Sequence, residues 1–74
     1  MATESAQSLI ASIGQTAGLV WRTLDADGPM AFAQLVKATG QPRDNVMLAL
    51  GWLAREDKVQ MEAQGRSRIV SLRR

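Results

Sequence analysis

The spacing of apolar residues changes at Asp57, and this change divides the chain into a helical part and a strand part. Before Asp57 the apolar residues recur every three or four positions, which is the repeat of a helix with one buried face. After Asp57 they alternate with polar residues, which is the repeat of a half-buried strand. Because 74 residues can enclose only one small core, we expect a single domain over residues 1–74.

The first helix is predicted from Glu4 to Leu24. Thr3 or Ser5 can cap its start by accepting hydrogen bonds from free backbone N–H groups. The segment Asp25–Pro29 contains residues that end helices and turn the chain. The predicted buried stripe consists of Ala6, Leu9, Ile13, Ala17, Val20 and Leu24, with Ile10 and Trp21 at its edge.

A second, shorter helix is predicted to end at Thr39. Its apolar residues at helical spacing are Phe32, Leu35, Val36 and Ala38. Met30, which follows a proline, can add a short third strand to a sheet. Gly40 can adopt the left-handed conformation that closes a helix, and Pro42 suits the first turn of the next helix because it lacks a backbone N–H. Residues 39–42 therefore predict a tight turn between two helices.

The third helix is predicted to run to Arg55 or Glu56, and a β-hairpin follows it. The buried face of this helix consists of Val46, Ala49, Leu50 and Leu53. In the first strand of the hairpin, the residues that alternate with polar neighbours are Val59, Met61 and Ala63. Residues 64–66 form the predicted tip around Gly65. The second strand is predicted over Ser67–Leu72, with Val70 and Leu72 facing inward.

Two helices joined by a short glycine-containing turn and followed by a hairpin are typical of a winged helix-turn-helix, an α+β fold that is mainly helical. In that fold the third helix can enter the major groove of DNA, and the hairpin forms the wing. Six of the nine Lys and Arg residues fall between Arg55 and Arg74, so positive charge is concentrated around the predicted wing although the net charge is only +2. This pattern favours a DNA-binding protein that acts in transcription or DNA organisation.

The candidate DNA contacts are Arg43, Asn45 and Arg55 on the third helix and Arg66 and Arg68 on the wing. Arginines beside a flexible hairpin tip can neutralise phosphates or enter a minor groove, although exposed hairpins also carry arginine as plain surface charge. The outward face of the third helix otherwise offers Asp44, Leu48 and Gly51, which carry no hydrogen-bond donor for base edges. We therefore expect contacts mainly to the phosphates of duplex DNA.

The alternative function is a protein-interaction or dimerisation module on the same scaffold. Its candidate interface residues are Gly14, Gly18 and Leu19 on the first helix and Met47 and Leu48 on the third. The two glycines permit a close approach that serves either packing within the chain or contact with a second copy. Trp21 and Trp52 fit the core or its edge better than a ligand site, because so small a domain needs large packing residues.

The residue inventory argues against catalysis, metal binding and a cofactor. The chain has no Cys and no His, so it lacks disulfides, thiolate ligands, the commonest metal ligand and the commonest general base. Two pairs of neighbouring carboxylates, Asp25 with Asp27 and Glu56 with Asp57, lie at predicted helix ends, where solvated charge is expected. No apolar run approaches the length of a membrane span and no secretory signal is recognised, so we expect a cytoplasmic protein that is not an enzyme.

Three segments carry a resemblance to a known family: Ile13–Trp21, Leu35–Thr39 and Ala49–Val59. The third contains Gly-Trp-Leu-Ala-Arg-Glu-Asp-Lys, a series that amphipathic patterning alone would not produce. These segments fall within Ile13–Leu72, and the chain resembles a family of short, stand-alone bacterial winged helix-turn-helix proteins of unknown function. The resemblance implies the winged fold and a DNA-binding role, and it carries over no ligand or catalytic residue.

Overall fold

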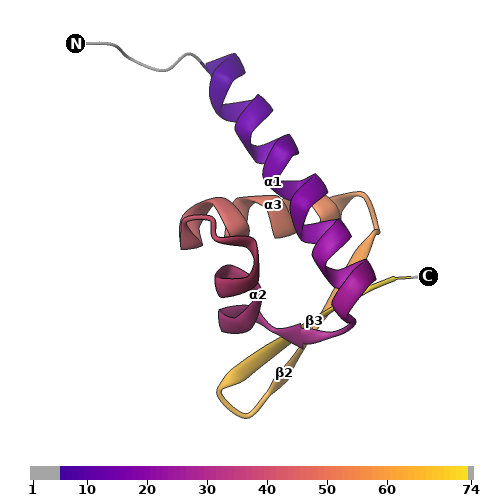
Figure 1. The fold of residues 1–74 in the computed structure, drawn as a ribbon. Helices are drawn as coiled ribbons and strands as arrows, with labels where there is room; N and C mark the ends of the chain where they lie inside the picture. The colour runs from indigo at the N-terminus through magenta and orange to yellow at the C-terminus, as the bar shows by residue number, and fades with distance from the viewer. Residues whose placement is uncertain (1–5, 74) are drawn as a thin grey trace.

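A computed structural model describes residues 6–73 and, from Ser8 onward, their side chains. The elements are α1 (Ala6–Asp27), β1 (Met30–Ala31), α2 (Phe32–Thr39), α3 (Arg43–Arg55), β2 (Val59–Gln64) and β3 (Ser67–Leu72) (Figure 1). The predicted order of helices, the short strand at Met30 and the bounds of the second hairpin strand are confirmed. Thr3 and Ser5, the predicted caps of the first helix, lie outside the described residues.

Helix α1 ends at Asp27, three residues beyond the predicted end at Leu24. Gly28 stops it by adopting a left-handed conformation with φ of 82°. In that conformation the Gly28 N–H donates a hydrogen bond of 2.8 Å to the Leu24 carbonyl. The acidic residues before Gly28 were expected to end the helix, but they are tolerated in its exposed last turn. The chain therefore turns only where glycine permits a positive φ.

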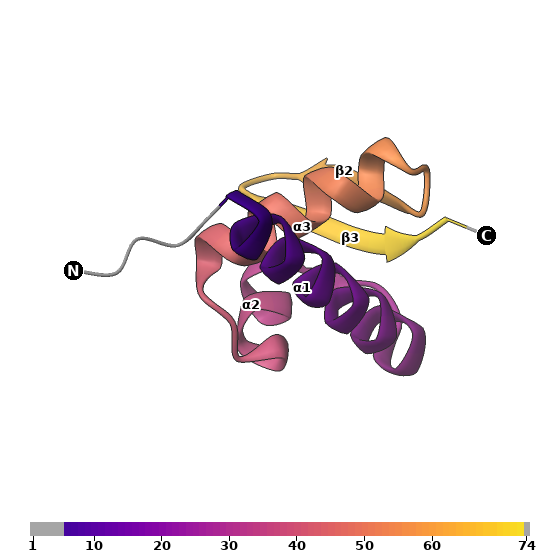
Figure 2. The same cartoon turned by 90° about the horizontal axis from the view of Figure 1, so that it is seen from above.

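The first turns of α1, Ala6–Ala11, extend past the other helices (Figure 1), and we call them the overhang. Figure 2 looks down on this end of α1 from above. The predicted buried stripe is confirmed from Ala17 to Leu24. It is wrong for Leu9, which is 51% exposed. The reason is geometric: a helix of 22 residues is about 33 Å long, and the rest of the domain covers only its C-terminal part. Helical periodicity predicted the direction of the side chains but not where the core ends.

The core lies where the three helices meet the sheet. Its buried apolar residues are Ala17, Val20, Leu24, Phe32, Leu35, Val46, Ala49, Leu50, Leu53, Val59 and Val70. All four residues predicted for the buried face of α3 are confirmed. On α2 the prediction fails at Ala38, which is exposed, while Thr39 is buried instead. Thr39 can be buried because its hydroxyl donates a hydrogen bond of 3.1 Å to the Val36 carbonyl.

The sheet is antiparallel with the strand order β1-β3-β2, so β3 is the central strand. Val70 of β3 lies opposite Met30 of β1 and Met61 of β2, and it is fully buried. Strand β2 leaves the core after Val59, and Met61 is 43% exposed. The half-buried pattern predicted for this strand is therefore confirmed at Val59 but wrong at Met61 and Ala63, because the hairpin extends beyond the helices that cover its base.

Gly40 forms the turn between α2 and α3, as predicted. Its φ of 67° is left-handed, and its N–H donates to the carbonyls of Val36 at 3.1 Å and Lys37 at 3.3 Å. Pro42 was predicted inside the first turn of α3, but it immediately precedes the helix, and its carbonyl accepts a hydrogen bond from the Val46 N–H. The short turn fixes the angle between the two helices.

Gly40→Ala is expected to lower the free energy of unfolding by about 1 kcal/mol, because alanine is strained at a positive φ. Gly51→Ala is the matched control. Gly51 lies within α3, and a Cβ placed on it would meet nothing within 4 Å. Alanine there should raise the free energy of unfolding by up to about 1 kcal/mol. Urea unfolding followed by circular dichroism measures both changes, and the same sign in both variants would contradict the assigned roles.

Candidate nucleic-acid interface

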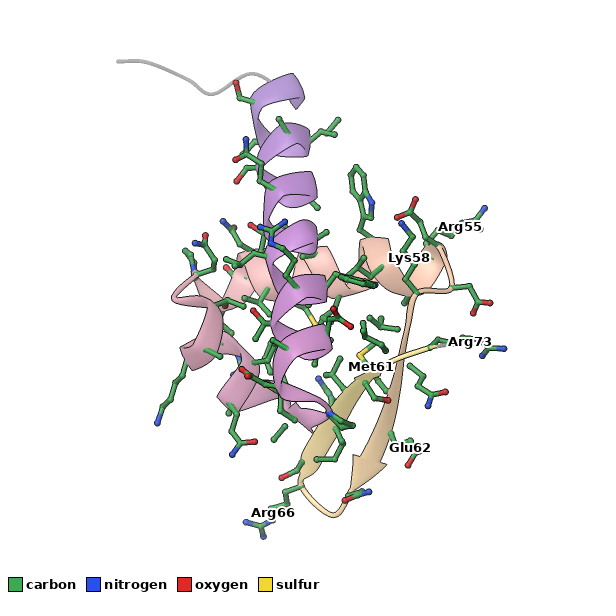
Figure 3. All side chains as sticks on the ribbon, turned by 45° about the vertical axis from the view of Figure 1, so that its right-hand side comes forward. Arg55, Lys58, Met61, Glu62, Arg66 and Arg73 are labelled. Carbon is green, nitrogen blue, oxygen red and sulfur yellow. The ribbon has the colours of Figure 1, made fainter. Side chains whose placement is uncertain are left out.

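The hairpin tip is a two-residue turn, Gly65–Arg66, closed by the pairing of Gln64 with Ser67. Gly65 has a φ of 61°, which a hairpin turn with glycine at its first central position requires. Arg66 follows directly and is exposed at the end of the wing (Figure 3). The turn therefore places one guanidinium group at the most distant point of the hairpin from the core.

Arg68 is placed beside the start of α2 by the strand register. On β3, Ile69 lies opposite Ala31, the last residue of β1. The chain passes directly from Ala31 into α2 at Phe32, and Arg68 is the next residue of β3 in that direction. On its other side, Arg68 lies opposite Ala63 of β2. The short strand β1 thus brings the N-terminus of α2 next to the wing.

Arg43, the first residue of α3, lies over the ring of Phe32, with 4.7 Å between the guanidinium carbon and the ring centroid. This distance is typical of a cation–π interaction, which orients the guanidinium group without neutralising its charge. Phe32 is buried, so its ring forms a fixed support. Sequence reasoning assigned Phe32 only to the core, and no spacing signal exists for this contact between two helices.

Arg43, Arg66 and Arg68 come together at one depression of about 270 Å³, and we call them the arginine cluster. The other lining residues are Ala31, Phe32, Ala33 and Ser67. Within residues 6–73, none of the three arginines forms an ion pair with a carboxylate. The first turn of α2, which has free backbone N–H groups, adds positive potential at the same place. The depression is suited to an anionic group such as a phosphate.

Arg55 lies at the opposite end of α3, about 18 Å along the helix axis from Arg43. Figure 3 shows Arg55, Lys58 and Arg73 on the same side of the molecule, distant from Arg66. Carboxylates pair with two of these three cations: Lys58 Nζ is 3.8 Å from Glu56 Oε1, and Arg73 Nε is 3.3 Å from Asp57 Oδ1. The predicted DNA contacts therefore separate into a cluster of three arginines and the distant Arg55.

Asn45, the fifth predicted contact, is half-buried on α3 and does not line the arginine depression. Between α3 and the wing the surface is instead apolar. There, Met47 and Met61 line a second depression of about 350 Å³ together with Glu62, Ala63 and Arg68. Sequence reasoning missed this pairing because it placed Met61 on the covered face of a half-buried strand. The two depressions share Arg68, so the basic and the apolar surfaces are adjacent.

The residues predicted for a protein interface do not form one surface. Gly14 and Gly18 line a groove between α1 and α3 together with Trp21 and Trp52. Leu19 lies at a different depression of α1, beside Gln15 and Gln41. Met47 is next to the wing, and Leu48 is 54% exposed on α3. Of these five residues, Gly14 and Gly18 line the same concave site.

Within the part of the chain that the structure describes, no group of three or more His, Cys, Asp or Glu side chains is placed to hold a metal ion. None of the helices in that part is long and apolar enough to cross a membrane. Three concave sites described above remain candidates for a binding function: the arginine depression, the methionine depression and the groove between α1 and α3.

The fold agrees with comparison to known proteins. A comparison with curated proteins finds no match. A family model described as "Winged helix-turn-helix domain (DUF2582)" matches residues 4–72, which is nearly the entire chain. The match confirms the winged fold and the family resemblance inferred from the sequence. The chain belongs to the DUF2582 family of winged helix-turn-helix domains.

Proposed function

We propose that this protein binds duplex DNA, chiefly through backbone phosphates, and that the arginine cluster is the principal contact. The observation that carries the proposal is the convergence of three arginines, none paired with a carboxylate within residues 6–73, at the junction of the wing and the first turn of α2. The winged helix-turn-helix fold supports it, because such folds commonly present α3 and the wing to DNA. The protein acts by binding rather than by catalysis, in the cytoplasm, in transcription or DNA organisation.

In this mechanism a phosphate occupies the arginine depression and accepts hydrogen bonds from the guanidinium groups. Arg43 is already oriented by Phe32, so its side chain loses little freedom on binding, and the backbone of Arg68 is fixed by a paired strand. Sequence specificity is weak because the neighbouring surface of Met47 and Met61 offers no donor to base edges. Binding is then driven largely by the release of counterions from DNA.

Fluorescence anisotropy of a labelled duplex across a series of salt concentrations tests the proposal. Each neutralised phosphate contributes a slope of about −0.9 to log K against log salt, so three contacts give about −2.7 or steeper. Arg66→Ala with Arg68→Ala should reduce the slope by about 1.8 and weaken binding at least tenfold. Arg55→Ala with Lys58→Ala removes the same charge at the opposite end and should leave the slope nearly unchanged. Salt-independent binding, or equal loss in both double variants, would rule the mechanism out.

A protein-interaction role is the second candidate, and the exposed Met47 and Met61 favour it. These side chains form an apolar surface where DNA recognition usually employs donors. A chemical-shift titration with a short random duplex separates the candidates. Shifts at Arg43, Arg66 and Arg68 support DNA, whereas unchanged resonances there at low ionic strength support a protein ligand at the methionines.

A further inference from the structure

The outward surface of α3 is apolar in its middle turns. Leu48 is 54% exposed and Met47 is 39% exposed, although both lie on a regular helix. Met61 of the wing extends this surface, because it is 43% exposed and lines one depression together with Met47. In Figure 3, Met61 lies between α3 and the tip of the wing, where Arg66 is labelled. We call Met47, Leu48 and Met61 the apolar patch.

The apolar patch adjoins the arginine cluster. Arg43 precedes Met47 by four residues, which is one helical turn and about 6 Å along the axis of α3. Arg68 lines both the arginine depression and the methionine depression. Duplex DNA presents the same two surfaces side by side, because phosphates border the major groove and base edges form its floor. A phosphate backbone on the arginine cluster therefore brings the neighbouring major groove to the patch.

Two carboxylates border the patch and favour base edges over phosphates there. Asp44 lies four residues before Leu48 on α3, and Glu62 lines the methionine depression. Both are exposed. They repel phosphates, but they can accept a hydrogen bond from any base pair, since each pair presents one amino group in the major groove. The carboxylates thus direct the phosphates to the arginines without choosing a base.

An apolar surface can recognise one feature of the major groove, the C5 methyl group of thymine. Thymine is the one standard DNA base that carries an apolar group on this edge, and aliphatic side chains pack against it. Burial of one methyl group contributes about fourfold to affinity. A patch without hydrogen-bond donors can therefore still favour A·T pairs.

We propose that α3 enters the major groove and that Leu48, assisted by Met47 and Met61, packs against thymine methyl groups. The protein then prefers duplex DNA that is rich in A·T pairs, and Leu48 is a specificity-determining residue. This inference rests on the proposed function, because it names the kind of duplex that the arginine cluster holds. The preference is graded with the number of buried methyl groups, since the two flexible methionines adapt to methyl groups in different positions.

Gly51 supports a close approach of DNA to the same face of α3. It lies three residues after Leu48, on the same side of the helix. Its backbone is not among the positive-φ glycines, and a Cβ placed on it would meet nothing within 4 Å. Glycine inside a helix is destabilising relative to alanine, so packing within residues 6–73 does not explain it. Contact with a base edge or sugar gives the position a reason to lack a side chain.

Replacement of thymine by uracil tests the inference, because uracil lacks the C5 methyl group and keeps the same hydrogen-bond groups and phosphates. Fluorescence anisotropy compares two duplexes of one mixed A·T sequence, which avoids the narrow minor groove of A-tracts. The uracil duplex should bind at least fourfold more weakly. The salt slope should be equal for the two duplexes, because the phosphate contacts are unchanged.

A duplex of G·C pairs supplies the converse test. Replacing cytosine by 5-methylcytosine adds a methyl group in the major groove and leaves the groups of the minor groove unchanged. Affinity should rise at least fourfold if the patch packs against methyl groups. A preference for A·T pairs that arises in the minor groove would produce no such gain.

Leu48→Ala should bring the ratio of thymine to uracil affinities close to one, while the salt slope stays the same because no charge is removed. Leu9→Ala is the matched control. It makes the same chemical change in the overhang of α1, at a residue that is 51% exposed, and it should preserve the ratio. Circular dichroism checks that both variants keep the fold.

Equal affinities for the thymine and uracil duplexes would overturn the inference and would leave the apolar patch to a protein ligand. A ratio that survives Leu48→Ala, or no gain from 5-methylcytosine, would overturn it as well. In each of these cases, salt-dependent binding that Arg66→Ala with Arg68→Ala weakens would still support the proposed function. Absence of binding to every duplex at low ionic strength would instead refute the proposed function and the inference together.

Discussion

Leu50→Ala is expected to lower the free energy of unfolding by about 2–5 kcal/mol, because it leaves a cavity in the centre of the core. Leu50 is 1% exposed and is among the largest fully buried side chains. A domain of 74 residues has a total stability of roughly 4–11 kcal/mol. The substitution therefore removes a large part of the total, and a measurable fraction of the protein should be unfolded without denaturant.

Urea unfolding followed by tryptophan fluorescence measures this loss, since Trp21 and Trp52 border the region where α1 meets α3. Leu48→Ala is the matched control, because it makes the same chemical change two residues earlier on the same helix. Leu48 is 54% exposed, so its truncation should change stability by no more than about 0.5 kcal/mol. Similar losses in the two variants would mean that α3 is rotated relative to the structure described above.

The double variant Arg43→Glu with Arg68→Glu reverses the charge on both sides of the arginine depression. We expect it to weaken duplex binding by about 100-fold or more. Each substitution removes a charge-assisted hydrogen bond worth about 1.5–3 kcal/mol and adds repulsion to the phosphate. Both residues are exposed and line the same depression. The effect should diminish as salt increases, because the repulsion is screened.

Arg55→Glu with Lys58→Glu is the charge-matched control for this variant. It produces the same change in net charge at the end of α3 where Glu56 pairs with Lys58 and Asp57 pairs with Arg73. If position rather than net charge governs binding, the control should lose no more than about threefold in affinity. Equal losses in the two variants would show that binding depends on overall charge and not on the arginine cluster.

The sequence predicted the helices, the turn at Gly40 and the hairpin because each depends on local chemistry. The buried face of α3 followed from spacing alone, and the left-handed turn followed from the presence of glycine. The end of α1 was misplaced because Asp25 and Asp27 are compatible with both helix and turn. Only the geometry at Gly28 decides between these conformations.

The errors and omissions in the site all concern contacts between elements. Periodicity placed Leu9 and Met61 on covered faces because it gives the direction of a side chain but not the extent of the layer that covers it. The support of Arg43 by Phe32 depends on the angle between α2 and α3, which no spacing encodes. Three of the five predicted DNA contacts converge because β1 and β3 pair in a register that brings the wing to the start of α2, where Phe32 supports Arg43.

The central position of β3 gives the two arginines of the wing different mobility. At Ile69 and Val70 the strand is paired on both sides, and Val70 is fully buried. The amides of this segment should therefore exchange with deuterium only when the whole domain opens, whereas those near Gly65 exchange through local fraying of the tip. Arg68, next to the protected segment, stays in register while Arg66 moves with the tip. In the proposed mode of DNA binding, Arg68 therefore fixes the position of the phosphate backbone and Arg66 follows its local curvature.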